Sequence, residues 1–169
     1  MIMQHKKNLE IDMVRQRITE GSILEIDVKG EYFVYAQILG KAGYVFFDFK
    51  SKNKLKDFSV LENAKILFFL SVFNDVITKG KWLKVNKLPI RSDFLIQPMQ
   101  FIQDALTPSK FRLYNPNIGE MTPVTKDECK GLEVAAIYEA EDIEQRISDY
   151  FAGRVNLDRQ KDLSIFDNI

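Results

Sequence analysis

The stretch that most constrains the fold is GSILEIDVKGEYFVYAQILGKAGYVFFDF, residues 21–49. Apolar and acidic residues alternate through positions 24–28, and this period of two is typical of a half-buried strand. Two glycine-containing breaks, at 29–31 and 40–43, separate three such runs and suit tight turns. The stretch therefore predicts three strands in an antiparallel meander.

Later segments extend this β-rich pattern. The apolar run AKILFFLSVF (64–73) predicts a central strand buried on both faces, and KWLKVNKLP (81–89) predicts a further strand. FIQDALTPSKFRLYN (101–115) predicts a hairpin with a type I turn at its centre, flanked by Asp104 and Arg112, which could form a pair across it. VAAIY (134–138) fits a helix or a strand, and we favour a strand.

Helical signals are short and lie mainly towards the C-terminus. Apolar residues at i, i+4, i+7 and i+8 from Ile143 predict a helix over 141–153, with Gly153 as its C-cap. Asn74 is expected to cap a short helical segment, and residues 125–128 have the pattern of a capping box. The polar tail that follows carries apolar residues near its end that are expected to dock.

These signals predict an α+β fold. We expect a strongly bent antiparallel sheet, or a partly open SH3-like barrel, with short helices that are mainly C-terminal. Residues 1–16 are polar and mixed, which predicts a flexible or loosely docked extension, and residues 17–169 are expected to form one domain. With 169 residues, of which 46% are hydrophobic, the chain is long enough to bury a sizeable core.

Several kinds of chemistry lack the residues that they need. The chain has one histidine, His5, and one cysteine, Cys129, which we expect to be a buried structural thiol. A histidine triad, an internal disulfide and a thiolate metal cluster are therefore excluded, and no phosphate-binding glycine loop occurs. We expect no enzyme activity, no cofactor and no metal. No signal peptide or long apolar run is present, which predicts a cytoplasmic protein without membrane contact.

Charge is balanced overall but unevenly distributed. Nine acidic residues stand against three basic ones between 120 and 149. On the helix predicted at 141–153, the acids are expected to project outward and form a ridge that binds a basic partner. Acids near a helix N-terminus also stabilise the helix itself, which is the alternative explanation. The candidate partner-binding residues are Glu141, Asp142, Glu144 and Asp149.

A basic region offers a second candidate site. Eleven Lys/Arg residues stand against four acids between 41 and 91, and alternating lysines would share one side of an extended loop. With Tyr44, Phe46 and Phe49 stacking on bases, this loop could bind single-stranded nucleic acid, although a solvated loop that protects a sheet edge is the stronger expectation. The candidate residues for this alternative are Lys50, Lys52, Lys54 and Lys56. A third, weaker hypothesis is a hydrolase that uses Asp48, Asp75 or Asp104.

Several segments together resemble the immunity protein 26 family of bacterial polymorphic toxin systems. They are GSILEIDVKGEYFVYAQIL, YVFFDF, FNDVITKGKWLKVNKLP, and FIQDALTPSKFRLYN followed by Gly119-Glu120 and TKDECKGLEVAAIYEAEDIEQRI, in that order. The resemblance runs from about Arg17 to Gly153. One departure is Ser22, where the family usually has a Gly-Asp pair, but serine can accept the same turn hydrogen bond.

The resemblance implies a non-enzymatic protein that binds a cognate toxin and neutralises it by occluding its active surface. Toxins of such systems are often nucleases, and this would suit an acidic contact surface. The alternative is a small nucleic-acid-binding β-barrel that uses the lysine loop, so nucleic acid is the less expected partner. The sequence leaves the toxin, the interface and the oligomeric state open.

Overall fold

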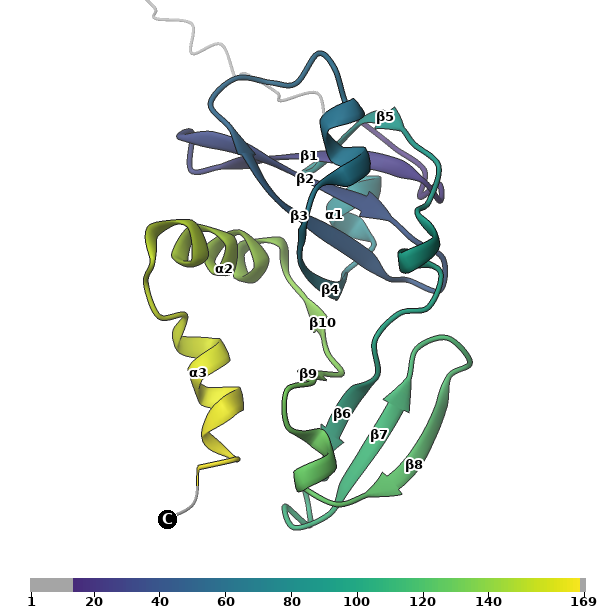
Figure 1. Cartoon of the computed structure of the whole chain (residues 1–169), viewed down its shortest axis with the longest axis vertical. Coiled ribbons are helices and arrows are strands. Elements are labelled where there is room, and N and C mark those ends of the chain that lie inside the picture. Colours follow the sequence, from purple (N-terminus) through teal and green to yellow (C-terminus); the bar gives the residue numbers. More distant parts are fainter. Residues whose placement is uncertain (1–13, 168–169) are drawn as a thin grey trace, which may run out of the picture.

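The computed structural model describes residues 14–167, which form two β-sheets with the two longest helices beside them (Figure 1). Residues 1–13, including His5 and most of the predicted extension, lie outside the described residues. Gln16 docks on the first sheet's side of the molecule. Its side-chain amide donates to the carbonyl oxygens of Ile77 and Trp82, each at 2.8 Å.

The first sheet has six strands and contains the predicted meander. Its strand order is β10-β4-β3-β2-β1-β5, and all neighbours are antiparallel except β10 and β4. Register shifts in the β1–β5, β2–β3 and β3–β4 pairs bend the sheet. The strands are β1 (Ser22–Val28), β2 (Tyr32–Ile38), β3 (Tyr44–Ser51), β4 (Ile66–Val72), β5 (Leu83–Lys87) and β10 (Ile137–Tyr138).

The second sheet lies below the first in Figure 1 and has four strands in the order β8-β7-β6-β9. Strands β6 and β7 are the predicted hairpin, and the Lys110 N–H donates to the Thr107 oxygen across its turn at 2.8 Å. The β6–β9 pair is parallel. The strands are β6 (Gln100–Gln103), β7 (Phe111–Asn115), β8 (Glu120–Val124) and β9 (Glu133–Val134).

Three α-helices and three single-turn 3₁₀ helices complete the described fold. The predicted C-terminal helix is confirmed, and Gly153 ends it in the left-handed conformation at φ 67°. The capping box is confirmed too: the Thr125 N–H donates to a Glu128 oxygen at 2.7 Å. The helices are α1 (Asp75–Thr78), α2 (Ala140–Ala152), α3 (Leu157–Ser164), η1 (Ser59–Asn63), η2 (Ser92–Phe94) and η3 (Asp127–Cys129).

Apolar cores cover both faces of the first sheet. One core joins strands β1–β4 to Trp82, α1 and α2, and it contains Ile143 and Ile147 of α2. The other core packs side chains of the opposite face under η1 and under Phe94 of η2. The second sheet has a smaller core of Phe101, Phe111 and Cys129, which the chain end covers with Ile165 and Phe166. Of the three apolar tail residues able to dock, Ile165 and Phe166 do so, whereas Leu163 is 41% exposed; the burial of Cys129 is confirmed.

The α+β class with a bent sheet is confirmed, but several details differ from the predictions. The strands form two sheets, and the first is not closed into a barrel. Strand β4 contacts both cores. Its outer neighbour is the edge strand β10, which has only two residues, so β4 is not central in the sheet. The Asn74 side chain makes no capping hydrogen bond. Asp104 accepts from the backbone N–H groups of Leu106 and Thr107, and it forms no ion pair with Arg112 within the described residues.

Candidate functional site

The acidic residues of α2 occupy three different environments. Glu141 is exposed and pairs with Lys81, whose hydrogen bond holds the pKa of Glu141 below its ordinary value. Asp142 is also exposed. Glu144 is half-buried and accepts a hydrogen bond from the Trp82 indole nitrogen at 2.8 Å. Glu141 and Asp142 are therefore the two members of the candidate set that lie fully at the surface.

Asp149 does not project outward as predicted, because only 6% of its surface is exposed. Its carboxylate accepts from Gln145 and Asn156, each at 2.9 Å, and from Arg154 at 3.1 Å. Burial raises the pKa of Asp149, but these hydrogen bonds outweigh burial and leave the pKa lowered. The prediction failed because Arg154 and Asn156 lie beyond the helix end, where they return to cover this residue.

The four lysines of the alternative site do not share one face. The Lys50 ammonium lies 5.1 Å from the ring centre of Tyr32, which packs against the α2-side core. The Lys54 ammonium lies 3.4 Å from Glu25 and 5.6 Å from the ring centre of Phe33, which packs against the opposite core. Strand β3 ends at Ser51, so the extended spacing assumed for the loop stops there.

The aromatic side chains that were expected to stack on nucleic-acid bases are also inaccessible. Tyr44 and Phe46 are each 1% exposed and belong to the core, while Phe49 is half-buried. A base cannot stack on a side chain that the sheet already encloses. Lys52 and Lys56 remain exposed, as in the solvated loop that was the stronger expectation.

The three candidate hydrolase carboxylates lie in separate surroundings. Asp48 accepts from the Tyr150 hydroxyl at 2.8 Å, and Asp75 pairs with Lys79 at 3.3 Å. Asp104 is held by two backbone N–H groups, and the bond from Thr107 is the largest cause of its lowered pKa. Burial raises the pKa of the Cys129 thiol. Within residues 14–167 no group of three His, Cys, Asp or Glu side chains is arranged to hold a metal.

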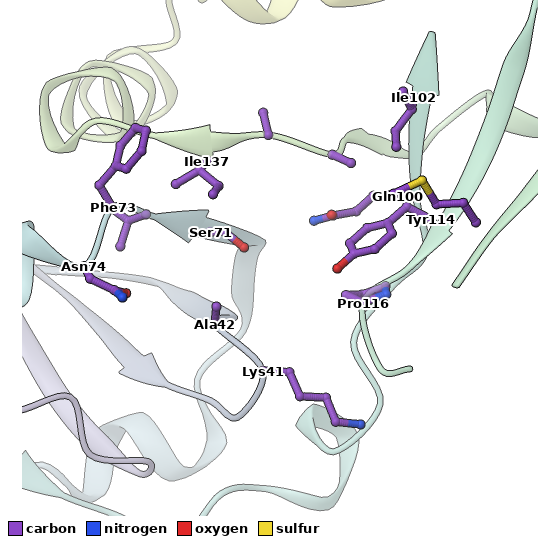
Figure 2. A pocket seen from close by; sticks show the side chains of 14 residues that line it. Lys41, Ala42, Ser71, Phe73, Asn74, Gln100, Ile102, Tyr114, Pro116 and Ile137 are labelled. Atoms are coloured by element: carbon purple, nitrogen blue, oxygen red, sulfur yellow. The ribbon is translucent and has the colours of Figure 1, made fainter. Parts of the chain in front are cut away.

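An apolar cleft of about 470 Å³ lies between the two sheets (Figure 2). The first sheet contributes the end of β4, with Phe73 and Asn74, and the β2–β3 turn. The second sheet contributes Gln100, Ile102 and Tyr114. No local sequence pattern predicts this cleft, because its two walls belong to segments that are distant in the chain.

The segment from β9 to β10 joins the two sheets and separates two cavities. Strand β9 pairs with β6 of the second sheet, and β10 pairs with β4 of the first. Ala135, Ala136 and Ile137 line the large cleft, while Val134, Ala136 and Tyr138 line a cavity of about 300 Å³. The strand expected at 134–138 thus consists of two short strands that belong to different sheets.

The smaller cavity contains a structural ion-pair network. Arg146 binds Glu133 with both terminal nitrogens, at 2.5 and 3.1 Å, and Arg159 lies 3.4 Å from the same carboxylate. Arg146 also stacks over Phe68, with its guanidinium carbon 4.4 Å from the ring centre. These contacts tie α2 and α3 to β9, while the Arg159 Nη1 atom is buried without a hydrogen-bond partner among the described residues.

The comparison with known families identifies the class of protein. The model of the family described as Immunity protein 26 matches residues 19–112, more than half of the chain. The chain therefore belongs to this family, whose membership indicates an immunity protein of a toxin system. The match covers β1 to the start of β7 and ends before α2, although the resemblance noted in the sequence extends to Gly153.

Other comparisons add nothing to this identification. No curated protein and no solved structure matches the chain. No helix among the described residues is both long enough and apolar enough to cross a membrane.

Proposed function

We propose that this protein is a cytoplasmic immunity protein that binds one cognate toxin and blocks the toxin's active surface. Membership of the Immunity protein 26 family is the observation that carries this proposal. The scattered carboxylates and the buried Cys129 give no support to a catalytic role. Binding, rather than chemistry, is the function that these residues suit best.

The proposed contact surface is the exposed acidic side of α2 near its N-terminus. Glu141 and Asp142 provide its charge, with Glu144 at its edge. Asp149 is left out because its carboxylate is buried and occupied by three donors. The charge of Asp142 has no ion-pair partner within the described residues, and Glu141 pairs only with a surface lysine. Such exposed charges increase the rate of association with an oppositely charged partner.

A nuclease is the toxin class that we favour. Surfaces that bind nucleic acid carry lysine and arginine residues that neutralise phosphates. An acidic helix that covers such a surface would take the place of phosphate charge and would exclude the substrate. The proposed interaction is therefore both steric and electrostatic.

Charge reversal tests the proposed surface. The double variant Glu141→Lys/Asp142→Lys should associate with the toxin encoded beside this protein's gene about tenfold more slowly at low salt. Cells that produce this toxin should be protected less well by the variant. The measurements are surface plasmon resonance at two salt concentrations and survival of the producing cells.

A matched control separates local from overall charge. Glu31→Lys/Glu62→Lys changes the net charge by the same amount, at exposed positions outside α2 and outside the cleft. This control should associate like the unmodified protein. Equal association rates for both double variants would remove the α2 surface from the proposal, while the immunity function itself would stand if both protect cells.

A further inference from the structure

The turn between β2 and β3 has an unusual backbone. Lys41 and Ala42 both have φ of 58°, in the left-handed region that non-glycine residues avoid at a cost of about 1–2 kcal/mol each. The Gly43 N–H donates to the Gly40 oxygen at 3.3 Å and closes the turn around them. The glycines thus flank the two strained positions instead of occupying them. Strained backbone of this kind is often found at functional sites.

Side chains from distant segments hold this turn in place. The Gln97 amide donates to the Gly40 oxygen at 2.8 Å and fills the space where a Cβ on Gly43 would lie. Gln97 and Asn117 exchange two hydrogen bonds, at 2.8 and 2.9 Å. The Lys41 ammonium donates to the backbone oxygen of Asn117. The ammonium therefore lies at the rim of the cleft, where the two sheets meet.

Lys41 is the single charged residue that lines the inter-sheet cleft. Within residues 14–167 it makes no ion pair, so its positive charge is not neutralised by a carboxylate. The cleft therefore carries positive charge and no negative charge of its own.

The rest of the cleft is apolar and open to solvent. Phe73 is 44% exposed, Ile137 is 58% exposed and Met121 is 51% exposed. Figure 2 shows Phe73 and Ile137 on one side of the cleft, Tyr114 and Ile102 on the other, and Lys41 at the lower rim. Grouped, exposed apolar side chains around a hollow are typical of a binding site, where they bury a partner's anchor residue.

We infer that the inter-sheet cleft binds a segment of the toxin in which a large apolar side chain lies next to a carboxylate. The apolar side chain enters between Phe73, Ile137 and Tyr114, and the carboxylate pairs with Lys41. Charge complementarity selects this partner, because the cleft offers an un-neutralised ammonium beside apolar walls. Naming the toxin as the source of the segment rests on the proposed function, while the chemistry of the segment rests on the cleft alone.

Strand β10 connects the cleft to the acidic surface of α2, of which Asp142 lines the smaller cavity on the other side of the β9–β10 segment. Ile137 lines the cleft, and the chain continues through β10 directly into α2, where Glu141 and Asp142 lie. An apolar centre with positive charge at one side and negative charge at the other would accept a partner in one orientation only.

Two small probes test the cleft without any toxin. N-acetylphenylalanine has an aromatic ring next to a carboxylate, and N-acetylphenylalanine amide has the same ring without the charge. In a ¹H–¹⁵N NMR titration the acid should shift the amides around the cleft and bind about three to five times more tightly than the amide. The Lys41→Gln variant should remove this difference while it retains the binding of the ring.

Controls are available on the same chain. Phe73→Ala/Ile137→Ala truncates two exposed side chains and should abolish the shifts, whereas Leu106→Ala truncates a 96% exposed residue outside the cleft and should leave them unchanged. Equal affinity for the acid and the amide, or shifts that survive the double truncation, would overturn the cleft inference. Neither result would bear on the immunity function, since no toxin is present.

A second arm uses the toxin itself. Lys41→Glu should weaken the complex with the toxin by about tenfold or more, because it places a carboxylate opposite the partner's carboxylate. Unchanged affinity of Lys41→Glu would show that the toxin does not use the cleft. If the toxin bound neither the variants nor the unmodified protein, the proposed function would be refuted instead.

Discussion

Asp149 lies in the acidic helix, but it serves the fold. It holds the start of the chain between α2 and α3 through Arg154 and Asn156, and it holds Gln145 within α2. Removing the carboxylate would leave these donors without their acceptor at a buried position. Helix α2 thus combines surface charge at Glu141 and Asp142 with a structural acid, Asp149, about two turns further on.

We predict that Asp149→Ala lowers the free energy of unfolding by about 1–3 kcal/mol at pH 7. Asp142→Ala, at an exposed position in the same helix, should change it by less than about 1 kcal/mol. Urea denaturation of the three proteins measures both effects. Equal losses for the two variants would contradict the structural role of Asp149.

The same residue predicts a pH dependence. The pKa of Asp149 is lower in the folded protein than the ordinary value, so its stabilising effect is present above the ordinary value of about 3.9. This contribution disappears as the pH falls through the folded-state pKa. The unmodified protein should therefore lose more stability between pH 7 and about pH 3 than Asp149→Ala does. An identical acid dependence for the two proteins would exclude this contribution.

At the scale of elements, the β2–β3 turn is less stable than the same turn would be with glycine at its left-handed positions. A turn with two left-handed residues is usually formed by Asn-Gly or Gly-Gly, whereas this chain has Lys41-Ala42. Glycine at the second position would remove the steric cost and would add back some conformational entropy to the unfolded chain. The turn therefore retains a steric cost at Ala42 that glycine would remove.

We predict that Ala42→Gly raises the free energy of unfolding by about 0.5–1 kcal/mol. Gly43→Ala is the opposite test, because its Cβ would lie 2.1 Å from the Gln97 side-chain oxygen. The buried Gln97 would then have to give up its bond to Gly40, which should lower stability. Thermal unfolding compares the variants. A destabilised Ala42→Gly protein would show that the turn is not strained.

The elements that local sequence determines were predicted well. The meander over 21–49 and the hairpin over 101–115 follow from a period of two and from turn residues, and both depend on neighbours in the chain. Helix α2 and the capping box at 125–128 likewise carry their signals within a few residues. The local signals of these elements are sufficient to predict the α+β class.

The candidate site was predicted less well because it depends on contacts between distant residues. Asp149 was expected at the surface because the helical periodicity of α2 carries no information on the following chain. That chain folds back and covers Asp149. The cleft requires the division of 133–138 between two sheets, which no local period marks. One local feature marks Lys41. The turn has Lys-Ala at two positions where glycine or asparagine is usual, which indicates that its backbone is held by other contacts.

At the scale of the whole molecule, two sheets of unequal core size share one apolar cleft. The first sheet is enclosed on both faces, whereas the second has three buried core residues on one face and the open cleft on the other. The hydrogen bond from Gln97 to Gly40 and the β9–β10 segment connect the two sheets. A rigid hollow of this kind needs little reorganisation when a partner binds.

The central claim is that the protein neutralises a toxin by forming a stable complex with it. The most direct measurement adds increasing amounts of the purified protein to the toxin encoded beside its gene and follows the toxin's activity together with the mass of the complex. We predict that toxin activity falls to the background at one equivalent, where light scattering detects a one-to-one complex. Full toxin activity in excess protein, with both chains remaining separate, would contradict the account.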